Sequence, residues 1–258
     1  MILESEWQSF VQQARAEGSR IEVLIKAFYC DHLLAPTDNA IDGGSHSGYH
    51  TIPLARRLTD GRVVAIDANA AMVEKLRAKI ESLPNIILEH AALQADPDAE
   101  SITFNVSTTH LGRSGISRIW DKIAPGTVEY APPTSVPATT IDNLVKKHAL
   151  GTLRFIKLDL EGGEFNAIRG AIKTMSTLRP VFVTEHSVRA PEVNGFTVSE
   201  YFQYIASLNY VVLAPNGKQV AVSNPFPFWY VFLVPVEVQS DVARGLEQAF
   251  LQTVAADP

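Results

Sequence analysis

The stretch of sequence that decides the fold runs from residue 41 to residue 51 and reads Ile41-Asp42-Gly43-Gly44-Ser45-His46-Ser47-Gly48-Tyr49-His50-Thr51. An apolar run leads into it and a helical pattern follows it, so its glycines belong to the first turn between a strand and a helix. In a doubly wound α/β sheet, ligands bind beyond the carboxyl ends of the strands, and a glycine-rich turn lets a ligand approach the backbone closely. We therefore predict a ligand site at the end of this first strand.

The spacing of the glycines narrows the class of ligand. A dinucleotide site has the pattern G-x-G-x-x-G, whereas this turn reads D-x-G-x-x-x-G and places Asp42 where it would repel a pyrophosphate. A carboxylate there favours a cationic ligand such as S-adenosylmethionine, which carries a sulfonium and an α-ammonium group but no phosphate. Asp67, at the end of the next predicted strand, is placed to accept hydrogen bonds from both ribose hydroxyls. The alternative is that the glycines only make a tight turn and that Asp67 caps the following helix.

Short apolar runs rich in Val, Ile and Phe alternate along the chain with longer stretches of helical period. The runs are residues 40–42, 62–67, 85–89, 153–159 and 180–185. Strands that alternate with helices are typical of a parallel sheet, and right-handed crossovers place helices on both of its faces. After the fourth run, apolar residues recur at helical spacing from Phe165 to Met175 and predict one helix. Near the end, residues 209–214 and the aromatic run at residues 226–236 predict a hairpin.

Two regions depart from this alternation. Residues 1–38 read as one or two helices that stop at Pro36, and we predict that they form an N-terminal helical cap. Residues 39–258 then form the main domain, with an insertion at about residues 95–140 that lacks a clear period and is rich in Gly and Pro. No linker rich in Ser and Gly separates these parts, so we predict one domain with a cap.

The composition is typical of a soluble acidic enzyme. The chain has 258 residues, 46% of them hydrophobic, with 22 Lys and Arg against 28 Asp and Glu and a formal net charge of -6. The single cysteine, Cys30, excludes an internal disulfide and fits a reducing compartment. The sequence shows neither a signal peptide nor an apolar window of the roughly 20 residues that cross a bilayer, so we predict a cytoplasmic protein without a membrane partner. It also shows no basic patch that would hold nucleic acid.

Three further motifs accompany the glycine turn. They are Val136-Pro137-Ala138-Thr139-Thr140-Ile141-Asp142-Asn143-Leu144, Ile156-Lys157-Leu158-Asp159-Leu160-Glu161-Gly162-Gly163-Glu164 and Arg169-Gly170-Ala171. Together with the turn, they resemble the FkbM-type methyltransferases, which are S-adenosylmethionine-dependent O-methyltransferases of natural products and sugars. The second motif is similar to the family's K-x-D-x-E-G-x-E block, and the resemblance covers about residues 38–235. The sequence departs from the family at His46, where Asn is common, and at Asp67-Ala68-Asn69, where a Glu-Pro pair is frequent.

The resemblance implies a class I methyltransferase fold, which is a Rossmann-like, mostly parallel sheet of seven strands, with S-adenosylmethionine as the cofactor. It also implies a small hydroxylated molecule, such as a natural product or a sugar, as the methyl acceptor. The residues expected to contact the cofactor lie in the glycine turn, after the next two strands and on the fourth strand. They are Asp42, Gly43, Gly44, Ser45, Gly48, Thr51, Asp67, Ala68, Asn69, Ala91 and Asp159.

Three charged residues, Lys157, Asp159 and Glu161, alternate along the fourth predicted strand and would project from one face of it. Such a row is costly in a core unless the two acids reach the open carboxyl edge and Lys157 pairs with a carboxylate. We therefore predict Asp159 as a contact on the methyl-donor side. The alternative is that Glu161 and Glu164 only cap and stabilise the turn into the next helix.

An alcohol that accepts a methyl group has to lose its proton to a base. The predicted catalytic residues lie near the carboxyl ends of neighbouring strands: Asp159, Glu161, His46 and His186, with Glu185 as a further candidate base. Histidine has the most suitable unperturbed pKa. A divalent cation held by Asp159, Glu185 and His186 is an alternative way to activate the hydroxyl. We do not expect a metal site, because the sequence shows no compact ligand spacing.

Two other functions stay open on the sequence alone. A nicotinamide-dependent oxidoreductase would share the fold but needs the pyrophosphate loop that this turn lacks. A non-catalytic protein would keep the fold without a reaction. The sequence does not identify the acceptor. It also leaves open a homo-oligomer, because the apolar face of the N-terminal helices would cover either the core or a second subunit.

Overall fold

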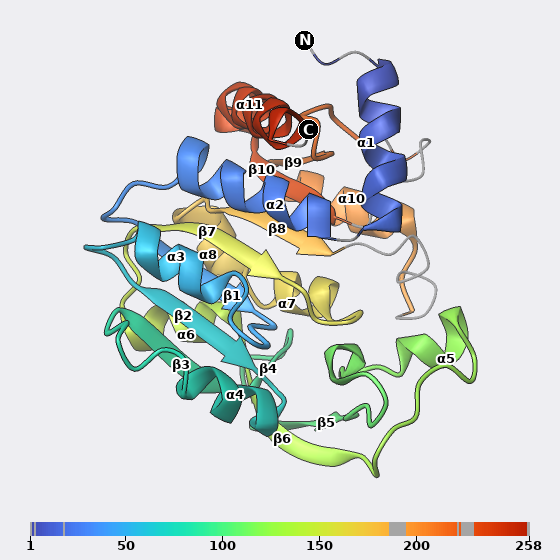
Figure 1. The fold of residues 1–258 in the computed structure, drawn as a ribbon. Helices are drawn as coiled ribbons and strands as arrows, with labels where there is room; N and C mark the ends of the chain where they lie inside the picture. Colours follow the sequence, from blue (N-terminus) through green and yellow to red (C-terminus); the bar gives the residue numbers. More distant parts are fainter. Residues whose placement is uncertain are drawn as a thin grey trace.

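A seven-stranded sheet runs through the centre of the structure (Figure 1). The computed structural model describes residues 2, 4–17, 19–185, 195–220, 222 and 230–256. Within these residues the strand order is β3-β2-β1-β7-β8-β10-β9. The strands are β1 (Asn39–Gly43), β2 (Val63–Asp67), β3 (Ile86–His90), β7 (Leu153–Leu158), β8 (Val181–Glu185), β9 (Tyr210–Leu213) and β10 (Tyr230–Pro235). Only β10 runs antiparallel to its neighbours, so the predicted doubly wound, mostly parallel α/β sheet is confirmed.

The strand order fixes where a ligand site can form. The chain moves outward from β1 through β2 to β3, and it later returns on the other side of β1 at β7. The loops that leave the carboxyl ends of β1 and β7 therefore diverge, and a crevice opens between them.

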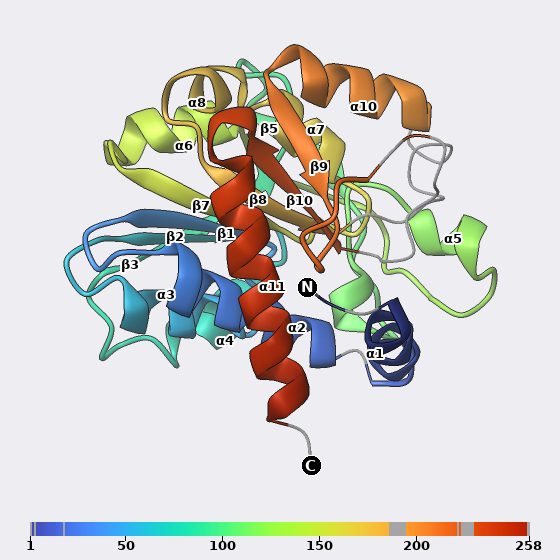
Figure 2. The same ribbon diagram turned by 90° about the horizontal axis from the view of Figure 1, so that it is seen from above.

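Helices cover both faces of the sheet, as Figure 2 shows from above. One layer contains α1 (Glu4–Ala16), α2 (Ser19–Ala27), α3 (Thr51–Arg57), α4 (Ala70–Arg77) and α11 (Gln239–Ala255); the other contains α6 (Ile141–His148), α7 (Glu164–Arg169), α8 (Ile172–Thr177) and α10 (Val198–Ser207). Alternate residues of each strand face the two layers: Phe155 of β7 packs in the first and Ile156 in the second. No helix in the described part of the chain is long and apolar enough to span a bilayer.

The N-terminal helices are part of the main core. They comprise α1, α2 and the π-helical segment η1 (Phe28–Leu33), where the sequence predicted one or two helices. Trp7 and Phe10 of α1 contact Phe250 of α11, with ring centroids 5.8 and 5.2 Å from it. Helix α11 also packs along α2 and η1, so the first and last helices cover the sheet as one apolar layer.

The predicted insertion forms a small second sheet beside the carboxyl ends of the main strands (Figure 1). The order of this sheet is β4-β6-β5: strands β5 (Ser101–Phe104) and β6 (Thr134–Thr139) lie within the insertion, and β4 (Ala92–Leu93) comes just before it. Two short helices, η2 (Leu111–Arg113) and α5 (Ile119–Ile123), lie between β5 and β6. This arrangement brings part of the insertion over the crevice.

The helix predicted from Phe165 to Met175 is broken into α7 and α8 at Gly170. A Cβ atom at Gly170 would lie 2.2 Å from the carbonyl oxygen of Gln94, so the backbone passes too close to the insertion for a side chain. The prediction of one continuous helix is therefore wrong, and Ile172, which it placed on the apolar face, is 49% exposed.

The C-terminal strands pair as the sequence predicted, with β9 antiparallel to β10. The turn between them begins where the backbone N–H of Ala214 donates to the carbonyl oxygen of Lys218, at 2.8 Å. Residues 226–229 of the aromatic run lie outside the described residues, and the described part of the run begins at Tyr230.

Candidate active site

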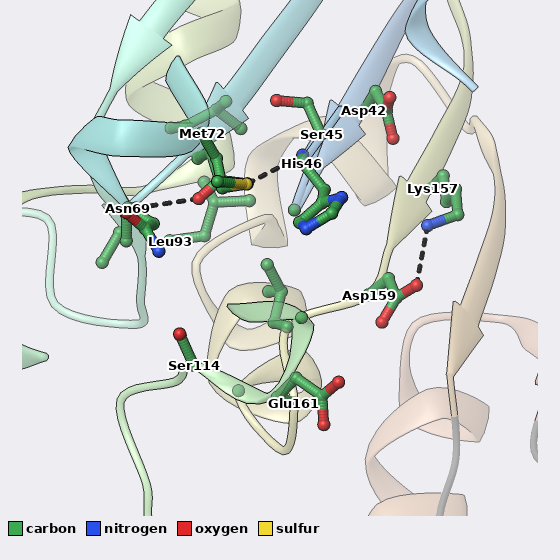
Figure 3. Close-up of a pocket in the computed structure, with 18 of the residues that line it drawn as sticks. Asp42, Ser45, His46, Asn69, Met72, Leu93, Ser114, Lys157, Asp159 and Glu161 are labelled. Atoms are coloured by element: carbon green, nitrogen blue, oxygen red, sulfur yellow. Dashed lines mark hydrogen bonds and ion pairs between the residues drawn. The ribbon is translucent and has the colours of Figure 1, made fainter. Parts of the chain in front are cut away.

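A cavity of about 480 Å³ opens at the carboxyl edge of the sheet (Figure 3). Small-molecule and cofactor sites typically enclose about 300–1,000 Å³. The walls come from the glycine turn after β1, the ends of β2 and β3, the segment after β7, helix α2 and the insertion. The cavity thus lies at the crevice that the strand order creates.

Most of the site residues predicted from the sequence line this cavity. They are Asp42, Gly44, Ser45, His46, Asp67, Ala68, Asn69, Ala91, Asp159 and Glu161. The structure places Gly43, Gly48, Thr51 and the further candidate base Glu185 outside its lining, and His186 lies outside the described residues. Gly48 instead allows close packing on α4, because a Cβ atom there would lie 2.5 Å from Leu76 Cδ1. The glycine motif thus contains two kinds of residue: some, such as Gly48, shape the turn, and others face the cavity.

The glycine turn is held between β2 and the segment after β7. The backbone N–H groups of Gly44 and Ser45 donate to the carbonyl oxygen of Ile66, at 2.9 and 3.1 Å. Gly44 has a φ of +76°, and a Cβ atom on it would lie 1.9 Å from the backbone oxygen of Asp159. Only glycine meets both conditions, so Gly44 sets the distance between the two sides of the cavity.

Asp42 has one carboxylate oxygen free for a ligand. Its Oδ2 atom accepts a hydrogen bond of 2.6 Å from the Thr51 hydroxyl, whereas Oδ1 has no partner among the described residues although the side chain is 1% exposed. Two more buried groups of the cavity wall, Ser45 Oγ and Asn69 Nδ2, likewise lack a partner within the described part of the chain. Because buried polar groups are nearly always hydrogen-bonded, these three atoms indicate a polar ligand.

Asp67 is fixed by the backbone of two turns. Its Oδ2 accepts a hydrogen bond from the His46 N–H and its Oδ1 accepts one from the Asn69 N–H, both of 2.8 Å. Burial raises the pKa of Asp67, although these two backbone hydrogen bonds oppose the shift. A carboxylate offers about four lone-pair sites, so Asp67 keeps capacity for two hydroxyl donors.

Beyond the strand β7, Lys157 and Asp159 form an ion pair, with Nζ 3.1 Å from Oδ2. The Lys157 side chain is almost completely buried, so its ammonium group needs this carboxylate. Burial alone would raise the pKa of Asp159, but the Lys157 ammonium outweighs it and holds that pKa below its usual value. Asp159 therefore stays ionised, with its partner as the sequence predicted.

Three carboxylates meet next to this ion pair. One oxygen each of Asp159, Glu161 and Glu185 can be chosen so that all three lie within 4.8 Å of one another. Burial and the Asp159 charge raise the pKa of Glu161 to about 8 and the pKa of Glu185 well above its usual value. Like charges at this distance cannot all ionise, so protons are shared within the group, and Glu185 hydrogen-bonds to Asp159.

Glu161 is oriented by the insertion. Trp120 Nε1 donates a hydrogen bond of 2.8 Å to its Oε2 atom, and Glu161 itself has a left-handed φ of 52°. Glu164 has a different role, because its Oε1 accepts from the backbone N–H groups of Leu160 and Gly162. Burial raises the pKa of Glu164 to about 7. The capping role considered for both acids thus describes Glu164, whereas Glu161 faces the cavity.

Two residues predicted as bases or metal ligands are histidines. The His46 side chain points into the cavity between the glycine turn and Asp159 (Figure 3), and the residue has a left-handed φ of 45°. His186 lies outside the described residues. Of the three metal ligands considered in the sequence analysis, the structure therefore describes Asp159 and Glu185.

Three polar residues at the site were not predicted from the sequence. Glu22 of α2 and His50 at the end of the glycine turn line the cavity, and Tyr230 of β10 bonds to Asp159 with its hydroxyl 3.0 Å from Oδ2. These residues come from distant parts of the chain, and no local motif around Glu22 or Tyr230 marks them. The position of His50 within the quoted turn was the only signal for it.

The fold and the site define a class I methyltransferase: a seven-stranded sheet with one antiparallel strand, and a cavity beside a glycine turn at its carboxyl edge. The sequence model of the methyltransferase FkbM domain matches residues 42–212, which is more than half of the chain. The chain therefore belongs to the FkbM methyltransferase family, and the resemblance seen in the sequence is confirmed.

Solved structures with a similar arrangement are distant in sequence. The methyltransferase FkbM from Methylobacillus flagellatus is 14% identical with a TM-score of 0.48, over 78% of this chain and 44% of that protein. An O-methyltransferase from Bacillus cereus in complex with S-adenosylhomocysteine is 14% identical with a TM-score of 0.44, over 91% and 92%. A precorrin-6y C5,15-methyltransferase from Geobacter metallireducens is 13% identical with a TM-score of 0.44, over 83% and 86%. The chain thus spans less than half of the length of the Methylobacillus protein, and no curated protein matches it.

Proposed function

We propose that this protein is an S-adenosylmethionine-dependent O-methyltransferase that acts in the cytoplasm on a hydroxyl of a small molecule, such as a natural product or a sugar. The observation that carries the proposal is a single cavity with two chemically different sides. One side has the glycine turn with Asp42 and Asp67, and the other has Asp159 and Glu161. Membership of the FkbM family supplies the reaction class.

The residues of the first side fit the cofactor. Asp67 has the lone pairs to accept from both ribose hydroxyls, and Asn69 Nδ2 is a donor without a partner among the described residues. Met72 and Ala91 provide an apolar surface on which an adenine ring can pack. The unpartnered Asp42 Oδ1 suits the positively charged methionine end. When bound, S-adenosylmethionine supplies an activated methyl group.

The second side has the groups needed to hold and deprotonate an acceptor. Methyl transfer is an in-line displacement, so the protein has to align the acceptor oxygen and exclude water. Glu161, with a pKa of about 8, is a base matched to neutral or slightly alkaline pH. Asp159 stays ionised beside Lys157 and orients the hydroxyl, and His46 is the alternative base.

The choice of cofactor separates this proposal from a nicotinamide-dependent enzyme. Isothermal titration should show binding of S-adenosylhomocysteine and none of NAD. Binding of NAD alone would overturn the proposal.

Measurement of methyl transfer tests the proposed acceptor and the proposed base. Screening of hydroxylated acceptors with the wild-type protein should yield a methyl ether product, which mass spectrometry identifies. The variant Glu161→Gln should lower kcat by about 10²–10⁴-fold while it keeps the affinity for S-adenosylhomocysteine, as expected for a lost general base. Full turnover by this variant would transfer the role of base to His46, which His46→Gln then tests.

A further inference from the structure

Glu22 stands out because it reaches the cavity from outside the region that the FkbM family model matches. It lies on α2, whereas the match begins at residue 42. Its side chain is 19% exposed and lines the cavity. Burying a carboxylate is energetically unfavourable unless hydrogen-bond donors or a cation compensate its charge. The groups that contact Glu22 therefore indicate what its carboxylate does in the cavity.

Two residues from elsewhere in the chain orient this carboxylate. His50 Nε2 lies 2.5 Å from Glu22 Oε2, and the Tyr230 hydroxyl lies 2.8 Å from Oε1. His50 is held in turn by the Tyr29 hydroxyl, 3.3 Å from its Nδ1. The carboxylate therefore has a defined position, and these two contacts occupy two of its roughly four lone-pair sites.

Near Glu22, the carboxylates outnumber the lysine and arginine side chains of the described cavity lining, and the only further basic partner of Glu22 there is His50, which carries a charge only when protonated. Glu22, Asp42 and Asp159 all act on the Lys157 ammonium group. Lys157 is the only lysine or arginine among the described residues that line the cavity. Three carboxylates thus share one ammonium group.

The hydrogen bonds show the same deficit of donors. The Tyr230 hydroxyl lies within hydrogen-bond distance of both Glu22 Oε1 and Asp159 Oδ2, at 2.8 and 3.0 Å, but it has a single proton to donate. Asp42 Oδ1 has no donor at all among the described residues. A cationic group with several N–H donors would satisfy these acceptors.

We propose that Glu22 is a cofactor-binding residue that receives the α-ammonium group at the methionine end of S-adenosylmethionine, together with Asp42. This inference rests on the proposed function. His50 and Tyr230 are positioning residues that hold the Glu22 carboxylate. The N-terminal cap then supplies one wall of the cofactor site in addition to covering the sheet.

The test compares two ligands that differ at the methionine end. S-adenosylhomocysteine has the α-ammonium group, whereas 5′-methylthioadenosine lacks the whole amino-acid part. In isothermal titration, Glu22→Gln should weaken S-adenosylhomocysteine binding by about 10–100-fold, the usual effect of losing a charged hydrogen bond. The affinity for 5′-methylthioadenosine should not change. The exposed Glu81→Gln serves as the matched control and should alter neither affinity.

A purely structural role for Glu22 predicts another result. In that case Glu22→Gln would reduce the affinity for both ligands equally and lower the melting temperature. Either this result or unchanged affinity for both ligands would overturn the assignment. If Glu22→Gln does not fold, Tyr230→Phe keeps the ring and removes one hydrogen bond to Glu22, and it should selectively reduce S-adenosylhomocysteine affinity several-fold. An equal effect of Tyr230→Phe on both ligands, or none, also overturns the assignment.

The proposed function fails in a distinguishable way. If the wild-type protein binds neither S-adenosylhomocysteine nor 5′-methylthioadenosine, the proposed function and the role of Glu22 fall together. If the wild type binds S-adenosylhomocysteine but Glu22→Gln does not discriminate between the ligands, only the role of Glu22 fails.

Discussion

The acidic residues at the two ends of the cavity differ in the groups that surround their carboxyl groups. At the end formed by the glycine turn, both oxygens of Asp67 accept hydrogen bonds from backbone N–H groups, of His46 and of Asn69. At the other end, Glu161 and Glu185 face the ionised Asp159, and burial together with its charge raises their pKa values. Backbone N–H donors hold the Asp67 carboxylate in one position. In the group of three acids, the protonation of each carboxyl group depends on the charge of its neighbours.

This difference suits the division of labour that we propose. A cofactor is the same molecule in every turnover, so a rigid turn with fixed donors and acceptors is sufficient to bind it. A base has to take up and release a proton, and a carboxyl group with a pKa near 8 can do this at neutral pH.

We expect the largest effect from a substitution in the glycine turn. Gly44→Ala introduces a Cβ atom 1.9 Å from the Asp159 backbone oxygen at a φ of +76°. We expect a loss of about 3 kcal/mol in the free energy of unfolding, measured by denaturant titration, and no measurable binding of S-adenosylhomocysteine.

Gly126→Ala is the matched control for this variant. Gly126 has the same φ of +76°, but a Cβ atom on it would point into open space, with no contact within 4 Å beyond its chain neighbours. Its substitution should cost only the backbone strain, about 1 kcal/mol, and should leave ligand binding intact. Equal losses from the two substitutions would show that the close approach of Gly44 to Asp159 has no special importance.

A smaller effect is expected at Asp67. Asp67→Asn removes the charge and one acceptor atom, so the affinity for S-adenosylhomocysteine should fall by about 1.5–3 kcal/mol. Because the ribose is common to both ligands, binding of 5′-methylthioadenosine should fall by the same factor, in contrast to Glu22→Gln. Isothermal titration gives both values, with the exposed Asp98→Asn as the control. Unchanged binding would remove Asp67 from the cofactor site.

The acid-rich end predicts a pH dependence of stability. The pKa of Glu161 rises from 4.5 to about 8 on folding, so its stabilising contribution is complete below pH 4.5 and is lost as the pH increases through 8. Glu161→Gln keeps an acceptor for Trp120 and removes this loss. At pH 8.5 it should therefore be more stable than the wild type by about 1–2 kcal/mol, and at pH 4 the two should be similar. A variant that is less stable at pH 8.5 would contradict the raised pKa.

The smallest expected effect concerns metal. Asp159, Glu161 and Glu185 are close enough to share a cation, but shared protons already account for their proximity. Exhaustive EDTA treatment should leave turnover unchanged, and added Mg²⁺ should not raise the melting temperature. Loss of turnover that Mg²⁺ restores would make this end of the cavity a metal site.

The same comparison explains how far the sequence predicts the molecule. The glycine turn and Asp67 lie in short continuous segments, and each strand of the parallel sheet appears as a short apolar run between helical patterns, so local patterns predict them. Glu22 and Tyr230 lie at the site through a contact between segments that are far apart along the chain, which no local pattern records. The close approach of the Gln94 carbonyl oxygen to Gly170, where the helix breaks, likewise joins two distant segments and leaves no local signal.

The packing of α11 on α2 has a consequence for biosynthesis. Helix α2 is synthesised before the segments that fix it, which are Tyr230 and the apolar face of α11. The glycine turn therefore precedes, in the order of synthesis, the contacts with Tyr230 and α11 that fix the wall containing Glu22. If Glu22 binds the cofactor as we propose, a complete cofactor site requires that α11 has been synthesised and has packed on α2.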